Sequence, residues 1–406
     1  MMEKNRKMKR LRAFCAAGER RSMQKKFVSK KYENGHATML GDLGPKAAAY
    51  EDLINFSIGD PDLKTDDRII EAAFADAKAG YTHYTDTRGM RELRDAIRAF
   101  YREEFDFEVA DEEVAVTTSA CQGMWAVMQA VLDEGDEVIV PEPYFSPYKD
   151  QIEMAGGVLV PLPTCEEENF EVNVHRIEPL ITPRTKAILF NTPNNPTGCC
   201  FDRAALEVIA DVAERHDLLV IADDIYTIFS YAGPFIPIGT LPGMAQRTVT
   251  VRSFSKDYCM TGWRIGYVIA PPQIIEALQL VGESNVYSAP SISQRAGIAA
   301  FRLRREVQPA IVEEFRRRTE AACAAIGEFD YLSVLPPQGS IYLFVNIKRT
   351  GLTSHEFAAQ LLERYHILVV PGNAFGTSGE GYVRLALTLG VDRIQEAFAR
   401  LPKDRF

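Results

Sequence analysis

Long apolar runs, metal-ligand motifs and paired cysteines are all missing from this chain of 406 residues. No stretch approaches the ~20 consecutive apolar residues of a membrane-spanning helix, so we expect no membrane partner. The six histidines form no H-E-x-x-H pattern and the seven cysteines form no C-x-x-C pair. The sequence therefore predicts no metal site, and thiols that stay reduced in the cytoplasm.

Positive charge is scarce outside the first 31 residues. These hold twelve Lys and Arg against Glu3 and Glu19, a formal charge of +10, whereas the whole chain carries −10. The other 375 residues therefore carry −20, and such an acidic body argues against nucleic acid as a partner. Three interpretations of the basic head stay open: a disordered tail, a targeting peptide, or an extension upstream of a true start at Met23.

Short apolar runs alternate with helical patterns through most of the chain. Seven runs are apolar throughout, which is typical of a parallel sheet buried on both faces. These candidate strands are Val114–Thr118, Glu137–Pro141, Gly157–Pro161, Ala187–Phe190, Leu218–Ala222, Thr248–Arg252 and Ile265–Ala270. Helical patterns occur at 66–79, 90–105, 123–132, 203–216, 273–280 and 291–327. We therefore predict an α/β fold, with a mostly parallel seven-stranded sheet in a three-layer α/β/α large domain.

The C-terminal part has a different pattern and predicts a smaller α+β domain. Strands are expected at Ile341–Ile347, Ile367–Val370 and Tyr382–Leu387, and helices at 354–364 and 391–400. Four segments follow: a basic extension (1–44), a segment that packs with the small domain (45–65), the large domain (66–295) and the small domain (296–406).

Charged residues stand at or after several predicted strands, where parallel sheets bind their ligands. Asp223 ends a buried run, and a carboxylate there is costly unless a cation or a strong donor faces it. Lys256 has Ser253 before it and Arg264 eight positions on, so it is either a reactive amine beside an anion site or a solvated lysine. Arg384 lies among apolar residues and needs an anionic partner, either internal or from a ligand.

Three turns carry further candidate groups, each with an ordinary structural alternative. The turn Ser119-Ala120-Cys121 precedes a helix and is either an anion site at the helix N-terminus or a plain N-cap. Phe145 lies in an aromatic loop that either stacks on a planar ring or belongs to the core. Asn195 lies in a turn with two prolines that is either a rigid platform for amide groups or only structural.

Together these residues resemble the class I/II aminotransferases, pyridoxal-phosphate enzymes of fold type I, over about residues 45–400. The landmarks are Gly59-Asp60-Pro61, Tyr84 with Gly89, Ser119–Cys121, Asn195-Pro196-Thr197-Gly198, Asp223 with Tyr226, Ser253, Lys256, Arg264, Pro371-Gly372 and Arg384. The resemblance implies an aminotransferase that moves an amino group between an L-amino acid and a 2-oxo acid by a ping-pong mechanism. Carbon–sulfur β-lyases and related elimination enzymes use the same residues, and that alternative stays open.

The resemblance also implies how the cofactor, pyridoxal 5'-phosphate, would be held. Lys256 would form a Schiff base with it, and Asp223 would keep its pyridine nitrogen protonated. Tyr226 and Asn195 would bind the 3-oxygen of the ring, and Phe145 would stack on its face. The phosphate would be held by Ser119, Ala120, Cys121, Ser253 and Arg264.

For the substrate, the resemblance implies that Arg384 binds the α-carboxylate, with Asn195 and Gly59 close by. Tyr84 would reach the phosphate of the neighbouring subunit, which implies a homodimer. A DNA-binding regulator built on the same fold is disfavoured, because the head is short and contains no helix-turn-helix pattern. The side chain of the substrate stays open, since the sequence places no second cation opposite Arg384.

Overall fold

The computed structural model describes residues 27, 29, 40–404 and 406. Its contacts divide the chain into two compact units, 1–42 and 43–406. Apart from a few residues, the basic head and the start at Met23 lie outside the described residues. The helices and strands around the candidate site belong to the second unit.

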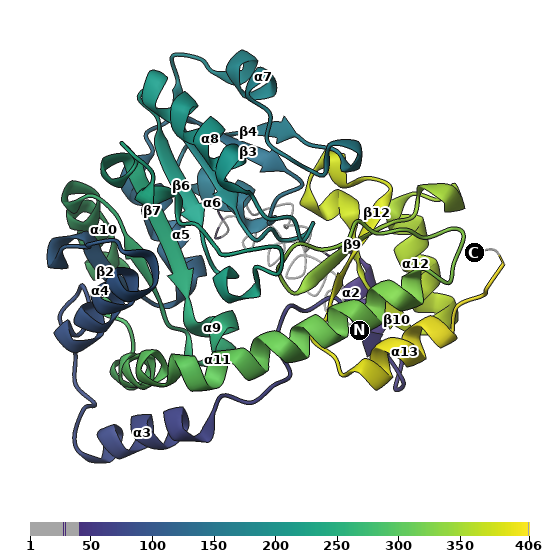
Figure 1. Ribbon diagram of the computed structural model, residues 1–406, viewed down its shortest axis with the longest axis horizontal. Coiled ribbons are helices and arrows are strands. Elements are labelled where there is room, and N and C mark those ends of the chain that lie inside the picture. The colour runs from purple at the N-terminus through teal and green to yellow at the C-terminus, as the bar shows by residue number, and fades with distance from the viewer. Residues whose placement is uncertain (1–26, 28, 30–39, 405) are drawn as a thin grey trace, which may run out of the picture. The chain divides into compact units, whose positions relative to one another are not determined.

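A seven-stranded sheet forms the centre of residues 43–406 (Figure 1). The strands are β2 (Val114–Thr117), β3 (Glu137–Glu142), β4 (Val158–Pro163), β5 (Thr185–Asn191), β6 (Leu219–Asp223), β7 (Thr248–Ser253) and β8 (Gly266–Ile269). Their order is β2-β8-β7-β6-β5-β3-β4; β8 is antiparallel to both neighbours and the other pairs are parallel. The predicted mostly parallel sheet is thereby confirmed.

Helices cover both faces of this sheet, as Figure 1 shows. They include α4 (Arg91–Phe105), α5 (Ser119–Val131), α6 (Pro147–Met154), α7 (Val174–Ile177), α8 (Arg203–Arg215) and α10 (Pro272–Asn285). Helix α3 (Asp67–Lys78) lies away from the sheet and packs on the long helix α11 (Ser291–Ile326). Within β3, Val138 and Val140 pack in the cluster that contains residues of α5, α6 and α10. Ile139 between them packs in the cluster that contains residues of α7 and α8. Alternate residues therefore enter two separate cores, which is why these runs are apolar throughout.

Two small sheets contain the strands of the C-terminal part, and one of them also includes a strand from the N-terminal segment. One has the order β11-β12-β9 and is antiparallel; the other pairs β1 with β10 in parallel. The strands are β1 (Ile54–Asn55), β9 (Tyr342–Asn346), β10 (Ile367–Leu368), β11 (Val370–Pro371) and β12 (Tyr382–Ala386). The helices beside them are α2 (Leu43–Ala47), α12 (Ser354–Tyr365) and α13 (Val391–Ala399).

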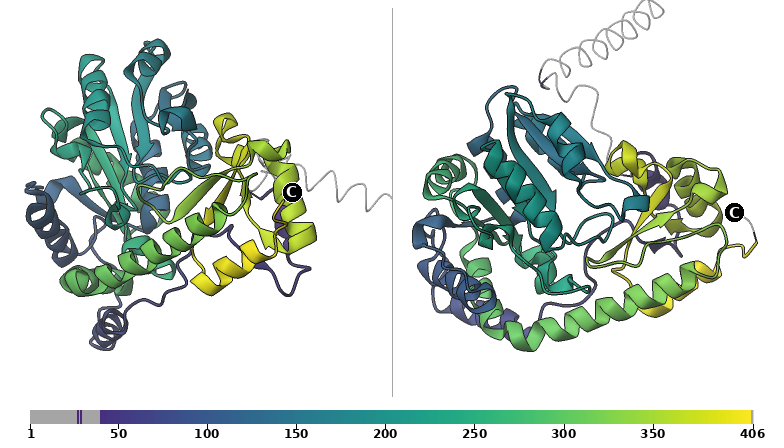
Figure 2. Two further views of the ribbon diagram at one scale, coloured as in Figure 1. Left: turned by 45° about the vertical axis from the view of Figure 1, so that its right-hand side comes forward. Right: turned by 45° about the horizontal axis from the view of Figure 1, so that its top comes forward.

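Helix α11 (Ser291–Ile326) extends from the side of α3 and α4 to the side of α13 (Figure 2). It spans the predicted boundary between the large and small domains at residue 295, and that division stays a prediction. Arg318 of α11 is buried and donates from Nη1 to Asp62 Oδ1 at 2.6 Å. This ion pair fixes the segment that leads from β1 to α3 against the long helix.

Three sequence predictions need correction. Helix α5 begins at Ser119 and not at Gly123, because small residues at its start pack closely against β8. The single strand expected at 367–370 is two strands, since the chain passes at Val369 from the β1 pair to the β12 sheet. The short helices α6 and α9 (Phe254–Asp257) were not predicted, because one or two turns carry little periodicity.

Candidate active site

Asp223 occupies the carboxyl end of β6, directly opposite Asn191 at the end of β5. Its side chain is buried, and its Oδ2 accepts a hydrogen bond from the Tyr148 hydroxyl. Its Oδ1 is buried with no hydrogen-bond partner. Burial raises the pKa of Asp223 to about 7, although the bond from Tyr148 opposes this change. A buried carboxylate with one free oxygen is an acceptor for a cationic donor.

Asn191 connects this carboxylate to the predicted Asn195. Its Nδ2 donates to the Asp223 carbonyl oxygen at 2.6 Å, and its Oδ1 accepts from the Asn195 N–H at 2.8 Å. The turn that follows contains cis peptide bonds at Thr192-Pro193 and Asn195-Pro196. The rigid turn predicted from the two prolines therefore presents Asn195 beside the end of β6.

Arg384 is the middle residue of β12 and is only 2% exposed. Its Nη1 donates to Asn195 Oδ1 at 3.2 Å, and its Nη2 donates to the Ser57 carbonyl oxygen. The guanidinium carbon lies 4.6 Å from the ring centre of Tyr342 and 5.1 Å from that of Phe375.

No carboxylate of the described part of the chain forms an ion pair with Arg384, whose Nε is buried without a partner. Burial lowers the pKa of this guanidinium. An internal salt bridge was the structural alternative for this arginine, and the described residues do not supply one. The guanidinium is therefore free to bind the carboxylate of a ligand.

Lys256 lies in the one-turn helix α9, which Ser253 caps by accepting from the Ser255 N–H at 3.0 Å. The lysine is half-buried, and its Nζ donates to the Gly59 carbonyl oxygen. A side chain at Gly59 would overlap the hydroxyl of Tyr342, so this position has room for glycine alone. Lys256 is thus directed toward the segment that also meets Arg384 through Ser57.

Ser253 faces Gly266 across the β7–β8 pair, beside the start of α5. A Cβ at Gly266 would lie 2.7 Å from the Ala120 nitrogen, so only glycine permits this approach of strand and helix. Ser119 has a φ of 78°, and the first N–H groups of α5 have no acceptor within the helix. This helix end, next to Ser253, has the donors of an anion site.

Arg264 lies two residues before the start of β8 and adopts a φ of 50°. Its side chain is exposed, and its Nη1 donates to the Thr261 carbonyl oxygen at 2.7 Å. The charges of Arg264 and Asp223 both act on the thiol of Cys121, although burial has the larger effect and raises the pKa of that thiol. The influence of both charges on Cys121 indicates that Arg264 and Asp223 lie near the start of α5.

Phe145 lies between β3 and α6, with its ring edge-on to Tyr148 at 5.5 Å between centres. Tyr148 was not singled out from the sequence, although it lies one helical turn beyond Phe145 and is the direct partner of Asp223. Glu142 was missed as well. It is buried and accepts four hydrogen bonds from Thr377 and Ser378.

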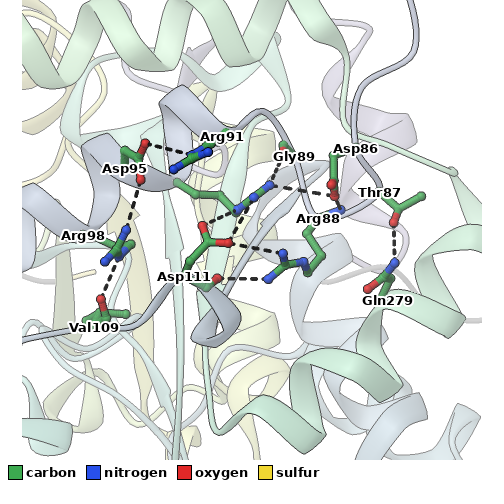
Figure 3. A network of polar contacts seen from close by, with 11 residues as sticks. Asp86, Thr87, Arg88, Gly89, Arg91, Asp95, Arg98, Val109, Asp111 and Gln279 are labelled. Atoms are coloured by element: carbon green, nitrogen blue, oxygen red, sulfur yellow. Dashed lines mark hydrogen bonds and ion pairs between the residues drawn. The ribbon is translucent and has the colours of Figure 1, made fainter.

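Tyr84 is a predicted residue that this single chain leaves in solvent. Its side chain is 85% exposed, and its ring lies edge-on to Tyr287 at 5.1 Å. The following segment is held by a polar network, shown in Figure 3. There, Arg94 Nε donates to Asp111 Oδ1 at 2.9 Å and Gln279 Nε2 donates to Thr87 Oγ1 at 2.7 Å. The segment next to the exposed tyrosine is therefore held in place by hydrogen bonds.

The fold and this site are those of an enzyme class that brings an amine, a carboxylate and a guanidinium together at the edge of an α/β sheet. Comparison with known proteins identifies the family. The family of class I and II aminotransferases matches residues 51–401, and the chain belongs to that family. The protein is thus an aminotransferase, and the resemblance stated from its motifs is confirmed.

Individual relatives agree with this assignment. The chain is 37% identical to an arginine–pyruvate transaminase of Pseudomonas aeruginosa over 86% of this chain and 89% of the relative. It is 39% identical to an aspartate aminotransferase of Pyrococcus abyssi over 88% and 92%. A solved single mutant of Thermus thermophilus aspartate aminotransferase matches with a TM-score of 0.88 and 32% identity, over 92% of this chain and 98% of that one. These relatives are named for different amino acids.

Proposed function

We propose that this aminotransferase uses pyridoxal 5'-phosphate, with Lys256 as the residue that attaches it. The single observation that carries this proposal is the buried, unpartnered Oδ1 of Asp223. The pKa of this carboxyl is about 7 because its burial outweighs the opposing hydrogen bond from Tyr148. A protonated pyridine nitrogen would supply both the missing hydrogen bond and the missing charge. The residues present therefore fit this cofactor.

The other groups of the cofactor match the remaining donors. The start of α5 at Ser119, Ala120 and Cys121, together with Ser253 and Arg264, would bind the phosphate dianion. Asn195 and the Tyr226 hydroxyl would donate to the ring 3-oxygen. Phe145 would stack on the ring, since its own ring contacts Tyr148, the partner of Asp223.

Arg384 would bind the α-carboxylate of the amino acid, because a carboxylate satisfies its unpartnered Nε and its buried charge together. Asn195 already touches this guanidinium and would therefore orient the same carboxylate. The buried rings of Tyr342 and Phe375 exclude water around the guanidinium, which strengthens the ion pair.

When bound, pyridoxal phosphate supplies an electron-withdrawing ring that accepts the electron pair released at the substrate Cα. Lys256 would serve as the base that removes the Cα proton and returns it at C4′ of the cofactor, across the nitrogen. Asp223 would hold the proton on the pyridine nitrogen throughout. After the first 2-oxo acid leaves, a second 2-oxo acid would bind to Arg384 in the same way, which gives ping-pong kinetics.

A second copy of this chain would complete the site. Tyr84 is exposed beside a segment that hydrogen bonds hold in place. Large side chains of neighbouring segments are exposed as well, namely Tyr81, Leu280 and Tyr287. We propose a homodimer in which Tyr84 of each subunit donates to the phosphate bound by the other.

The state of the cysteines indicates the cellular compartment of the enzyme. The six described cysteines are all free of disulfides, which supports a reducing compartment, and we propose the cytoplasm. Among the described residues, no helix is long and apolar enough to cross a membrane.

A spectroscopic experiment tests the assignment of Lys256. The purified protein should show a visible absorbance band of bound cofactor, and Lys256→Ala should lose or shift this band. Lys186→Ala, a change at a partly exposed lysine of β5, should leave it unchanged. The assignment is wrong if the spectrum of Lys256→Ala equals that of the unaltered protein.

The reaction itself is tested by mixing the holoenzyme with each of the twenty amino acids in turn. We expect loss of the visible band with release of one 2-oxo acid and no ammonia. Release of ammonia with pyruvate or a thiol would instead identify a β-lyase. The amino acids that react in this panel also identify which substrate side chains the enzyme accepts.

A further inference from the structure

Tyr342, the first residue of β9, lies where three predicted site residues meet. Its hydroxyl oxygen is 3.0 Å from the hydroxyl oxygen of Tyr226, and both side chains are buried. Its ring centre lies 4.6 Å from the guanidinium carbon of Arg384. Its hydroxyl also lies against Gly59, the residue that accepts the hydrogen bond of Lys256. The sequence did not single out this tyrosine.

The two hydroxyl groups constrain one another. A hydroxyl donates one hydrogen bond, so Tyr226 can donate to a cofactor oxygen only if it does not donate to Tyr342. Tyr342 must then be the donor between the two oxygens. A phenol that accepts a hydrogen bond becomes a stronger donor itself, because the two bonds polarise each other. Tyr342 therefore determines how strongly Tyr226 donates.

Building on the proposed function, we propose that Tyr342 is a positioning residue for Tyr226. Its hydroxyl donates to the Tyr226 hydroxyl and thereby orients Tyr226 as donor to the 3-oxygen of the cofactor. A stronger bond from Tyr226 to this oxygen lowers the affinity of the Lys256 linkage for its proton. Tyr342 itself contacts neither reacting atom.

The test is a pH titration of the visible band in the holoenzyme. We expect Tyr342→Phe, which keeps the ring, to raise the midpoint by about one pH unit, since one hydrogen bond contributes about a tenfold change. Tyr382→Phe is the matched control: its hydroxyl donates to Glu166 at 3.0 Å, and its ring stacks on Phe344 in the same sheet. This control should leave the midpoint unchanged.

The path through Tyr226 is tested in a double variant. In a Tyr226→Phe background, Tyr342→Phe should have no further effect on the midpoint. A further rise in that background would overturn the role of Tyr342 as the residue that orients Tyr226.

The outcomes separate the two proposals. A protein with no visible band overturns the cofactor assignment, whereas a band that titrates identically in Tyr342→Phe and the unaltered enzyme overturns only the role of Tyr342. If Tyr342→Phe does not fold, Tyr226→Phe still tests the proposal, because an unchanged midpoint in that variant would show that Tyr226 donates no bond for Tyr342 to orient.

Discussion

Asp223 offers the sharpest test of the site, because its burial has a measurable effect on the stability of the protein without cofactor. The carboxyl is buried with one oxygen unpartnered, and its pKa is raised to about 7. In the unfolded chain an aspartate has a pKa of about 3.9. Replacing the carboxyl in Asp223→Asn removes this titration and keeps the shape of the side chain.

The sign of the effect follows from proton binding. Below about pH 4 the carboxyl is protonated in both states and costs nothing. Between about pH 4 and pH 7 the unfolded chain releases the proton while the folded protein retains it, so stability falls as the pH rises. The full slope is about 1.4 kcal/mol per pH unit, and it decreases near pH 7 because the folded carboxyl begins to ionise there, which leaves about 2 kcal/mol between pH 5 and pH 7. Above about pH 7 the cost is constant.

The assay is denaturant unfolding of the cofactor-free protein at pH 5, 6, 7 and 8, at one fixed protein concentration. Relative to the unaltered protein, Asp223→Asn should gain about 2 kcal/mol between pH 5 and pH 7 and nothing further by pH 8. Asp106→Asn, the same change at an exposed residue with a φ of 50°, should show no such trend. Parallel pH profiles for Asp223→Asn and the unaltered protein would refute the buried, uncompensated carboxyl.

Two further substitutions examine the substrate and phosphate sides separately. Arg384→Lys should raise the KM for the amino acid by about 100-fold, because a lysine cannot make the bidentate pair, while the Kd of the cofactor changes less than threefold. Equal losses of both affinities would count against a carboxylate site. Gly266→Ala should weaken cofactor binding at least tenfold in an absorbance titration, since its Cβ would lie 2.7 Å from the Ala120 nitrogen, whereas Gly262→Ala meets no atom and should bind normally. Normal binding by both variants would show that the start of α5 does not hold the phosphate.

Much of this architecture was predictable, because the sheet is buried on both faces and its strands are therefore apolar throughout. Asp223 and Lys256 could be found for the same reason, since Asp223 directly follows such a run and Lys256 lies four residues beyond the end of another. Tyr148 and Tyr342 could not. Nothing in the residues next to either tyrosine marks it, and only its hydroxyl partner distinguishes it from the core. Such partners come from elements far apart in the sequence.

The sequence by itself determined the family and the chemical groups, since the order of Asp223, Lys256, Arg264 and Arg384 is a property of the chain alone. The tertiary structure decided which of these charges are compensated. Arg384 has no internal carboxylate among the described residues and Asp223 has a free oxygen, and both facts depend on what surrounds them after folding. Burial makes these unpartnered groups costly, and that cost is the physical reason why we expect them to bind a ligand.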